Sequence, residues 1–354
     1  NYVTKTSVSL AKGSSNDAPT YWRFGSAFNR DSSEGFYDEE EHNQMEVNAD
    51  LMLNINKSIT DAFNFVGSIW GSMMHRTTAY DYRAIQLELP DLYNLGNMKA
   101  GTSLVNRNEH YQRSINSIFG TAELSYNEYL FLTFTGRNDW ASVLPLNNNS
   151  FFYPSVTVSA VLSDMLPIKS NTLNFLKLRG GWEEVGSNGP LDPGEIHPVY
   201  ELSSAPWGGN TFAEFPNTLN NANIKSQTTK GYEGGLELRM FSNRLRFDFT
   251  YYDQTSVDLV LPVQVSTSSG VGYVWDNIGK LNNKGVEIQL SGTLIETANK
   301  DFALDFGINF AKNNNMVLKA GKDDENDEET LLIGNLWNMN LEAREGYAYG
   351  AIVG

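Results

Sequence analysis

The sequence predicts an all-β protein, as part of a large antiparallel, up-and-down transmembrane β-barrel. Three observations indicate this fold class. Apolar and polar residues alternate over runs long enough to cross a bilayer, and short connections alternate with long ones along the chain. No run of about 18 apolar residues is present, which excludes a transmembrane helix but not a barrel strand, because barrel strands are apolar only at every second position.

The clearest alternation lies between Asp276 and Lys312. Successive side chains of a strand point to opposite faces, so this pattern gives one apolar face and one polar or small face. A transmembrane strand needs about 9–11 residues, whereas strands of soluble sheets are most often about 5–6 residues long. We therefore expect a hairpin with lipid on one side and water on the other. Its apolar positions are Val286, Ile288, Leu290, Leu294, Phe302, Leu304, Phe306, Ile308 and Phe310.

The other elements follow from the same pattern. Residues 1–42 form a loop-rich start, in which Tyr2–Leu10 and Tyr21–Asn29 have strand character and Asp31–His42 is an acidic loop. Residues 43–354 hold about eleven barrel strands, and the run Tyr347–Val353 has strand character. The strands expected before the hairpin are Gln44–Asn54, Ala62–His75, Gln112–Ser125, Tyr129–Asn138, Phe151–Leu162, Phe175–Val185, Thr229–Met240 and Leu245–Asp253.

The connections between these strands differ in length in a regular way. Tyr126–Glu128 and Phe241–Arg244 are short, whereas Arg76–Tyr111, Gly186–Thr228 and Gln254–Trp275 are long. Outer-membrane barrels have short periplasmic turns and long extracellular loops, whereas a soluble sandwich has no reason to keep its long loops at one end. On the pattern alone, a soluble sandwich, a propeller and a solenoid remain alternatives. Charged residues expected on the wet face are Glu123, Arg137, Lys177, Arg179, Glu183, Glu237 and Arg239.

Composition excludes some classes of function. The 354 residues carry a formal net charge of −16, which argues against nucleic acid as a partner because phosphate binding needs a basic surface. There is no cysteine, so neither a disulfide framework nor a thiolate zinc site can form.

Several motifs in the same order resemble the SusC/RagA-type TonB-dependent outer-membrane transporters. Arg137-Asn138-Asp139 is similar to a strand-ending turn of that family, and it is followed by an Asn-rich loop and by Phe152–Val156, which resembles the family's Tyr-Phe-Pro-Ser-Val strand start with a changed order. Further similar stretches, which extend the resemblance over Gln44–Gly354, are Leu173–Gly189, Thr228–Tyr252, Asn277–Leu290 and Glu345-Gly346-Tyr347.

The resemblance implies more than the alternation does. It implies a barrel of about 22 strands, large enough to need an internal plug, in the outer membrane of a Gram-negative bacterium. It also implies a SusD-like surface lipoprotein as a lid, energy from TonB-ExbB-ExbD through the plug region, and import of oligosaccharides or oligopeptides. No plug domain, TonB box or closing strand is recognised in residues 1–354, so we expect the chain to be one part of a longer barrel protein.

No catalytic site is expected. The four histidines are scattered, and neither a His-Glu-x-x-His nor a Gly-x-Ser-x-Gly motif occurs, so the sequence does not indicate an enzyme. The acidic run Asp323–Glu329 has oxygen ligands for Ca²⁺ at Asp323, Glu325 and Asp327, but it lacks the glycine and the spaced glutamate of an EF-hand loop. A solvated loop is the favoured interpretation, and no metal or cofactor is expected.

Aromatic residues in the long connections are the candidate binding residues. They lie among Gly, Asn and Pro on the face expected to be outside the cell, where a flat ring can stack on a sugar or an extended peptide, or contact the lid. Burial within the fold of the loop itself is the alternative. The candidates are Trp140, Tyr200, Trp207, Phe212 and Trp275.

Two other functions compete with an energised transporter. A passive porin has the same kind of wall without coupling to TonB. A secreted β-rich adhesin or carbohydrate-binding protein would instead bury Val286, Leu290, Phe306 and Phe310 against a second sheet.

Overall fold

The structure is a computed structural model that describes residues 2–11, 35–166, 168, 170–197, 199–202, 208, 210–297, 299, 301–321, 330–336 and 339–353. It divides into two compact units, Asn1–Ala49 with Met73–Ser114 and Asp50–Ser72 with Ile115–Gly354. Nearly all of its elements are β-strands. Among the described residues, no helix is long and apolar enough to span a bilayer.

The first unit contains β1 (Tyr2–Ala11) and parts of β2 (Phe36–Ser58), β3 (Phe63–Gln86) and β4 (Val105–Tyr126). β1 pairs antiparallel with β2, from Tyr2 opposite Met45 to Ala11 opposite Phe36. The small core of this unit is formed by Tyr37, Ile85 and Leu87, with Leu95 packed against them.

Two boundaries expected in this unit are wrong. The acidic stretch Asp31–His42 was expected to be a loop, but its described part is mostly strand, because β2 begins at Phe36. Half of the stretch Arg76–Tyr111 is also strand, since β3 continues to Gln86 and β4 starts at Val105. Backbone pairing extends these strands through polar sequence in which no apolar alternation marks them. Tyr21–Asn29, expected to have strand character, lies outside the described residues.

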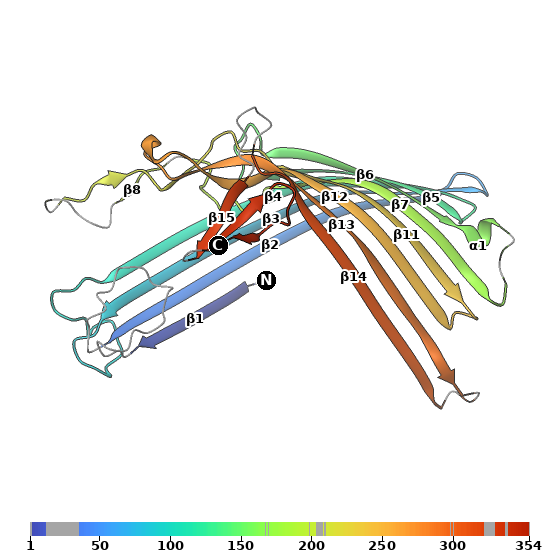
Figure 1. Ribbon diagram of the computed structural model, residues 1–354, viewed down its shortest axis with the longest axis horizontal. Helices are drawn as coiled ribbons and strands as arrows, with labels where there is room; N and C mark the ends of the chain where they lie inside the picture. Colours follow the sequence, from blue (N-terminus) through green and yellow to red (C-terminus); the bar gives the residue numbers. More distant parts are fainter. Residues whose placement is uncertain are drawn as a thin grey trace. The chain divides into compact units, whose positions relative to one another are not determined.

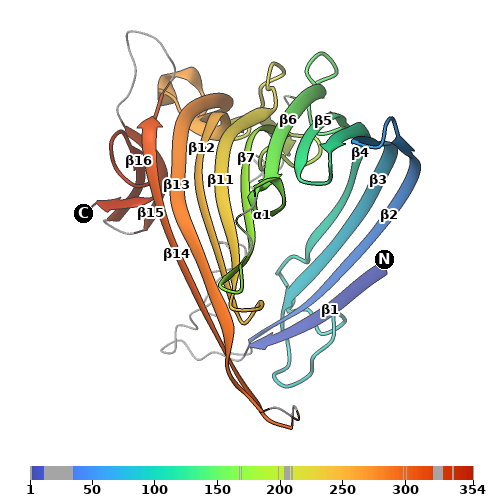
Figure 2. The ribbon, with the colours of Figure 1, turned by 90° about the vertical axis from the view of Figure 1, so that its right-hand side faces the viewer.

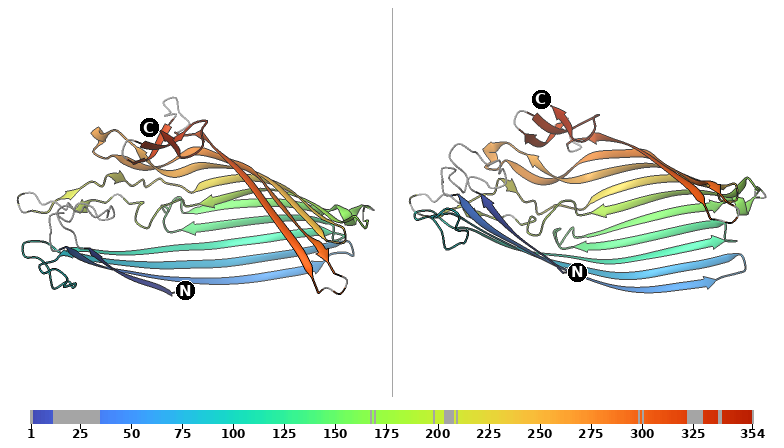
Figure 3. Two further views of the ribbon diagram at one scale, coloured as in Figure 1. Left: turned by 60° about the horizontal axis from the view of Figure 1, so that its bottom comes forward. Right: turned by 90° about the horizontal axis from the view of Figure 1, so that it is seen from below.

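The second unit holds a meander of long antiparallel strands. Each described strand from β4 to β7 pairs with the next in the chain, then β7 pairs with β11, and β11 to β14 pair in order. Figure 1 shows β11 to β14 side by side, and the right-hand view of Figure 3 shows the order from β5 onwards. These strands are β5 (Leu130–Ala141), β6 (Ser150–Val161), β7 (Leu173–Ser187), β11 (Gln227–Met240), β12 (Leu245–Gln264), β13 (Tyr273–Glu296) and β14 (Ala303–Lys319).

Short connections alternate with longer ones in this unit, but the expected bounds of the connection Gln254–Trp275 are wrong, because β12 continues to Gln264 and β13 starts at Tyr273. β4 and β5 are joined by a turn in which Asn127 and Glu128 have positive φ, and β11 and β12 by a turn in which Phe241, Ser242 and Asn243 do. Positive φ at such positions gives hairpin turns the twist that antiparallel strands require. By contrast, 39 positions, numbered 188–226, separate β7 from β11. Within this long connection lie the short strands β8 (Glu201–Leu202), β9 (Ala213–Glu214) and β10 (Thr218–Leu219).

The two faces of the sheet differ as the alternation predicts. Phe310 lies opposite Ile288, and Ile308 opposite Leu290, whereas Asn309 between them lies opposite Gln289. Ile308 and Phe310 are 58% and 52% exposed, so this apolar face is not sealed inside a core. Glu123, Arg137, Lys177, Arg179, Glu183, Glu237 and Arg239 share the polar face by register. The expected two-faced sheet is therefore confirmed.

Buried residues concentrate at the ends of strands rather than between two sheets. One cluster joins Ala141, Val143 and Leu144 to three residues of later segments, Leu191, Ile224 and Val260. A second cluster attaches the small sheet of β15 (Thr330–Leu336), β16 (Met339–Arg344) and β17 (Ala351–Val353) through Leu331 and Ala343 to Ile278 and Val317. Figure 2 shows this small sheet beside the end of β14.

The structure corrects one expectation near the C-terminal end of the sequence, where β14 continues to Lys319 and β15 and β16 follow. The strand expected at Tyr347–Val353 is confined to Ala351–Val353. The described residues also form two short helical turns, α1 (Leu162–Met165) after β6 and η1 (Thr267–Ser269) between β12 and β13.

Candidate functional site

The polar face of the second unit carries a hydrogen-bonded network centred on Arg179. Its guanidinium donates to both carboxylate oxygens of Asp248, from Nη1 to Oδ2 at 3.0 Å and from Nη2 to Oδ1 at 2.9 Å. Nη2 also donates to Thr250 Oγ1 at 2.6 Å, and Nε lies 3.8 Å from Glu233 Oε1. This bidentate geometry fixes both the position and the plane of the guanidinium.

The Arg179 side chain reaches across a whole strand to make these bonds. Arg179 on β7 lies opposite Gly235 on β11, which lies opposite Thr250 on β12. A Cβ at Gly235 would stand 2.6 Å from Arg179 Nε and 2.7 Å from Cζ, closer than real Cβ contacts allow. The absence of a side chain at Gly235 therefore lets Arg179 lie over β11 and bind Asp248.

A second glycine lies between two other polar side chains of the same face. Gly285 on β13 is opposite Tyr252 on β12 and Asn313 on β14. Tyr252 donates from its hydroxyl to Asn313 Oδ1 at 3.2 Å, and a Cβ at Gly285 would stand 2.6 Å from that hydroxyl. The polar face is thus tied together by contacts that cross strands where no side chain intervenes.

Another cation on this face is bound within its own strand. Arg137 Nε donates to Asp139 Oδ1 at 2.8 Å, and the hydroxyl of Tyr153 donates to Asp139 Oδ2 at 2.7 Å. Arg137 Nη2 also donates to Ser117 Oγ at 2.9 Å, and its Cζ lies 5.0 Å from the centre of the Phe119 ring. Asp139 is only 7% exposed, and a buried carboxylate needs close donors. Arg137 and Tyr153 supply them.

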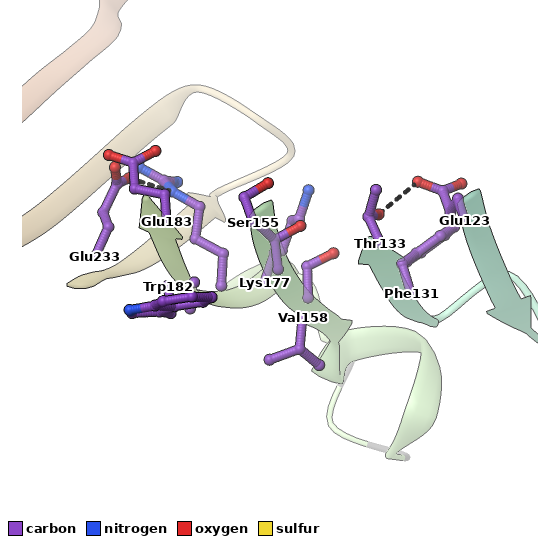
Figure 4. Close-up of a pocket in the computed structure, with 14 residues that line it drawn as sticks. Glu123, Phe131, Thr133, Ser155, Val158, Lys177, Trp182, Glu183 and Glu233 are labelled. Atoms are coloured by element: carbon purple, nitrogen blue, oxygen red, sulfur yellow. Dashed lines mark hydrogen bonds and ion pairs between the residues drawn. The ribbon is translucent and has the colours of Figure 1, made fainter. Parts of the chain in front are cut away.

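Two hollows flank Arg179 on the polar face. The first, of about 520 Å³, lies over β5, β6 and β7, and Figure 4 shows Glu123, Thr133, Ser155 and Glu183 on the side of the strands opposite to Val158 and Trp182. The second, of about 670 Å³, is lined by Tyr252, Gln254, Asn283, Glu287 and Asn313 among others. Arg179 and Glu233 line both hollows. The two together offer carboxylates, amides and hydroxyls, which suit hydrogen bonding to a polar ligand.

Among the described residues, no group of three His, Asp or Glu side chains could hold a metal ion. The residues considered as calcium ligands from the sequence, Asp323, Glu325 and Asp327, lie outside the described residues.

The four aromatic candidates that the structure describes do not form one site. Tyr200 and Phe212 lie next to the paired strands β8 and β9 and are 66% and 43% exposed, as a contact surface requires. Trp207 lies outside the described residues. Phe215 is not among the residues predicted from the sequence, but its ring centre lies 4.7 Å from that of Tyr200, and it lies in the same long connection beside Pro216.

Trp140 and Trp275 do not lie in loops, so their expected position is wrong. Trp140 belongs to β5, where it pairs with Ser150, and Trp275 belongs to β13, where it pairs with Pro262. Both strands extend past the polar residues Asn138 and Asp276, at which the alternation places their ends, because backbone pairing continues. Trp275 packs against the buried cluster around Leu144, which matches the alternative of burial.

The long connection between β7 and β11 is anchored by its own buried groups. Leu191 and Ile224 are each 1% exposed. The Asp192 N–H donates to Glu195 Oε2 at 2.6 Å, while burial raises the pKa of the Glu195 carboxyl above its ordinary value. The exposed aromatics at β8 and β9 therefore extend from a connection that is fixed at both ends.

Comparison with known proteins agrees with this architecture. Residues 3–350 match the family model described as TonB dependent receptor-like, beta-barrel. TonB-dependent receptor P3 of Formosa agariphila is 30% identical over 244 residues, which cover 67% of this chain and 24% of that protein. TonB-dependent receptor SusC of Bacteroides thetaiotaomicron is 29% identical over 218 residues, covering 60% of this chain and 21% of SusC.

Solved structures give the same fold. The structure of the RagAB peptide transporter matches with a TM-score of 0.77 at 19% identity, covering 88% of this chain and 34% of the matched chain. The chain spans about a quarter of the length of the curated relatives named above. Because the family model covers nearly all of the sequence, the chain belongs to the TonB-dependent receptor-like β-barrel family and, like the members of that family, is an outer-membrane protein.

Proposed function

We propose that this chain forms part of the wall of a transporter that imports glycan or peptide oligomers across the outer membrane. The observation that carries the proposal is the two-faced sheet. One face presents exposed apolar side chains, and the other presents a hydrogen-bonded polar surface with two hollows. A wall between lipid and a water-filled passage needs this division of residues.

The polar face would act by binding and guiding rather than by reacting. Arg179 and Arg137 are held by aspartates, so their positions are fixed before a ligand arrives. Neighbouring carboxylates and amides, such as Glu287 and Asn283, line the second hollow and offer hydrogen bonds to the hydroxyls of a glycan or the amides of a peptide. The wall would therefore bind many polar oligomers, whatever the order of their sugar or amino-acid units.

The partners would be a SusD-like surface lipoprotein and the TonB-ExbB-ExbD system. The relationship to SusC and the fold shared with the RagAB transporter support this assignment. The exposed pair of Tyr200 and Phe215, with Phe212 nearby in the same connection, offers an apolar surface for the lid or for the substrate.

Uptake by cells that express the full-length gene product tests the function. Labelled glycan oligomers and labelled peptides are supplied separately, with and without a protonophore that removes the energy for TonB. We expect uptake of one class that stops when the protonophore is added. Uptake that persists would indicate a passive porin, and no uptake of either class would contradict the proposal.

Substitution of the exposed aromatic pair tests the lid or substrate contact. Tyr200→Ala with Phe215→Ala removes two exposed rings that pack on each other, so we expect binding of the lid or oligomer to weaken by roughly tenfold, the size of a modest binding contact. Surface plasmon resonance on the detergent-solubilised full-length protein measures it. Phe241→Ala is the control, because Phe241 is also about half exposed but lies in the short turn between β11 and β12. Equal affinity of the double variant and wild type would remove this pair from the site.

A further inference from the structure

A groove of about 440 Å³ lies on the second unit where β2, β3, β4 and β5 contribute to it. Its floor contains the small residues Gly67, Gly120, Ala122 and Gly136. Its walls include Leu53, Ile55, Ile69 and Phe134, which are 62%, 50%, 60% and 50% exposed. We call this feature the glycine-floored groove.

The groove opens on the apolar face of the sheet. The hydroxyls of Ser68 and Thr121 are hydrogen-bonded at 2.6 Å on the polar face. Adjacent positions in a strand belong to opposite faces, so Gly67, Gly120 and Ala122 belong to the apolar face. Gly120 lies opposite Gly136, and Ala122 lies opposite Phe134. Phe134 belongs to the same face as Val158, which Figure 4 shows on the side of the strands away from Ser155.

Missing side chains create the depth of the groove. A Cβ at Gly120 would lie 3.3 Å from the backbone oxygen of Ser68 and 4.0 Å from Ile69 Cγ1, so the floor is at the level of the sheet backbone. The aliphatic walls rise beside it from β2 and β3. The rings of Phe65 and Phe152 lie 2.9 Å and 3.2 Å from where a Cβ would stand at Gly67 and Gly136, so a narrow, flexible apolar chain approaches the backbone at Gly120. Elsewhere on this face large side chains such as Phe310 and Ile308 cover the backbone.

The setting of the groove identifies its occupant. The groove is continuous with the apolar face that contacts the membrane, so hydrocarbon surrounds it. Its volume is roughly fifteen times the share of one molecule in liquid water, but its floor is sheet backbone already paired between strands and its walls are aliphatic or aromatic, so water has no partners there. An unfilled groove would forfeit the dispersion contacts of every wall atom.

We propose that the glycine-floored groove holds one acyl chain of a bilayer lipid in a defined position. In a membrane, the hydrophobic effect does not favour protein over lipid, so close packing decides which chains stay. The groove supplies that packing on its floor and on its walls. This inference depends on the outer-membrane setting and not on what the protein transports.

Photo-crosslinking in nanodiscs tests the proposal. Full-length protein is placed in phosphatidylethanolamine and phosphatidylglycerol nanodiscs that contain a trace of phosphatidylethanolamine with a diazirine on one acyl chain. Mass spectrometry then locates the labelled residues. We expect labelling to concentrate on the segments that carry Ile69, Ala122 and Phe134, beyond their share of the exposed apolar surface.

Two variants and a matched control separate a defined site from general lipid contact. Ala122→Leu fills the floor, and labelling there should fall by about fivefold, as expected when roughly ten close carbon–carbon contacts are lost. Ile69→Ala removes a wall that is already 60% exposed, so the fold tolerates it, and labelling should also fall. Ala160→Leu makes the same change as Ala122→Leu on the same face outside the groove and should leave labelling unchanged.

Three results would overturn the proposal. Labelling could be spread over the apolar face in proportion to exposure. Labelling could be unchanged in both Ala122→Leu and Ile69→Ala. The groove segments could instead cross-link to another protein chain, which would make this surface a protein interface. Loss of transport would bear on the proposed function alone.

Discussion

Arg137 and Arg179 both bind an aspartate on the polar face, but they reach it in different ways. Arg137 binds Asp139, two residues further along its own strand. Arg179 binds Asp248, which lies two strands away, by passing over Gly235. Residues two apart on a strand always share a face, so the first pair depends only on β5 being a strand. The second pair depends on the register of three strands and on one missing side chain.

The two aspartates differ in burial, whereas the two arginines do not. The Asp139 side chain is 10% exposed and that of Asp248 is 35% exposed, while those of Arg137 and Arg179 are 34% and 31% exposed. An ion pair that shares its charge with water stabilises a protein less than a buried pair does, and removal of one partner from a buried pair leaves the other unsatisfied. The Arg137 region should therefore be the more sensitive of the two to loss of its carboxylate.

The largest effect is expected for Asp139→Ala. The change removes the carboxylate that accepts hydrogen bonds from both Arg137 and Tyr153, and we expect a loss of about 3 kcal/mol in the free energy of unfolding. Urea titration of the full-length protein folded into detergent micelles, followed by tryptophan fluorescence, measures the loss. Asp139→Asn keeps one acceptor and should lose less. A loss below that of Asp248→Ala would reverse the ranking of the two regions.

A smaller loss is expected for Gly235→Val, which blocks the path of Arg179. The new side chain would displace the guanidinium from Asp248, with a loss of about 2 kcal/mol in the free energy of unfolding. Gly234→Val is the matched control, because Gly234 is the adjacent residue on the opposite face and has open space where a Cβ would stand. The same titration compares the two variants, and equal stabilities would show that Arg179 does not need Gly235.

The smallest loss is expected for Asp248→Ala, about 1 kcal/mol in the wild-type background, since the pair is about one-third exposed. In the Gly235→Val background the same substitution should cost close to nothing, because the ion pair is already broken. A double-mutant cycle on these two positions measures the coupling. Additive losses would mean that the glycine and the ion pair act independently.

Sequence reasoning succeeded where one period governs the structure. Alternation located the hairpin of β13 and β14 and placed Lys177, Arg179 and Glu183 on one face, since residues two apart cannot do otherwise in a strand. It failed at strand ends. β2 includes the acidic residues before Gln44, and β5 includes Trp140, because backbone pairing continues through side chains of any polarity.

The candidate site was predicted only in part for the same reason. Tyr200 and Phe212 are exposed, but the ring that packs on Tyr200 belongs to Phe215, which no spacing in the sequence marks. The partner of Arg179 is likewise 69 residues away. Contacts at such separations depend on which strands become neighbours.

The sequence by itself determined that this protein is a wall of long strands with one apolar and one polar face, because the strand period acts on each residue locally. Only the tertiary structure decided which polar groups meet, where Gly235 opens a path for Arg179, and where Gly120 deepens the apolar face. Those features arise from the register between strands, and register is set by pairing across the sheet rather than by neighbours in the chain.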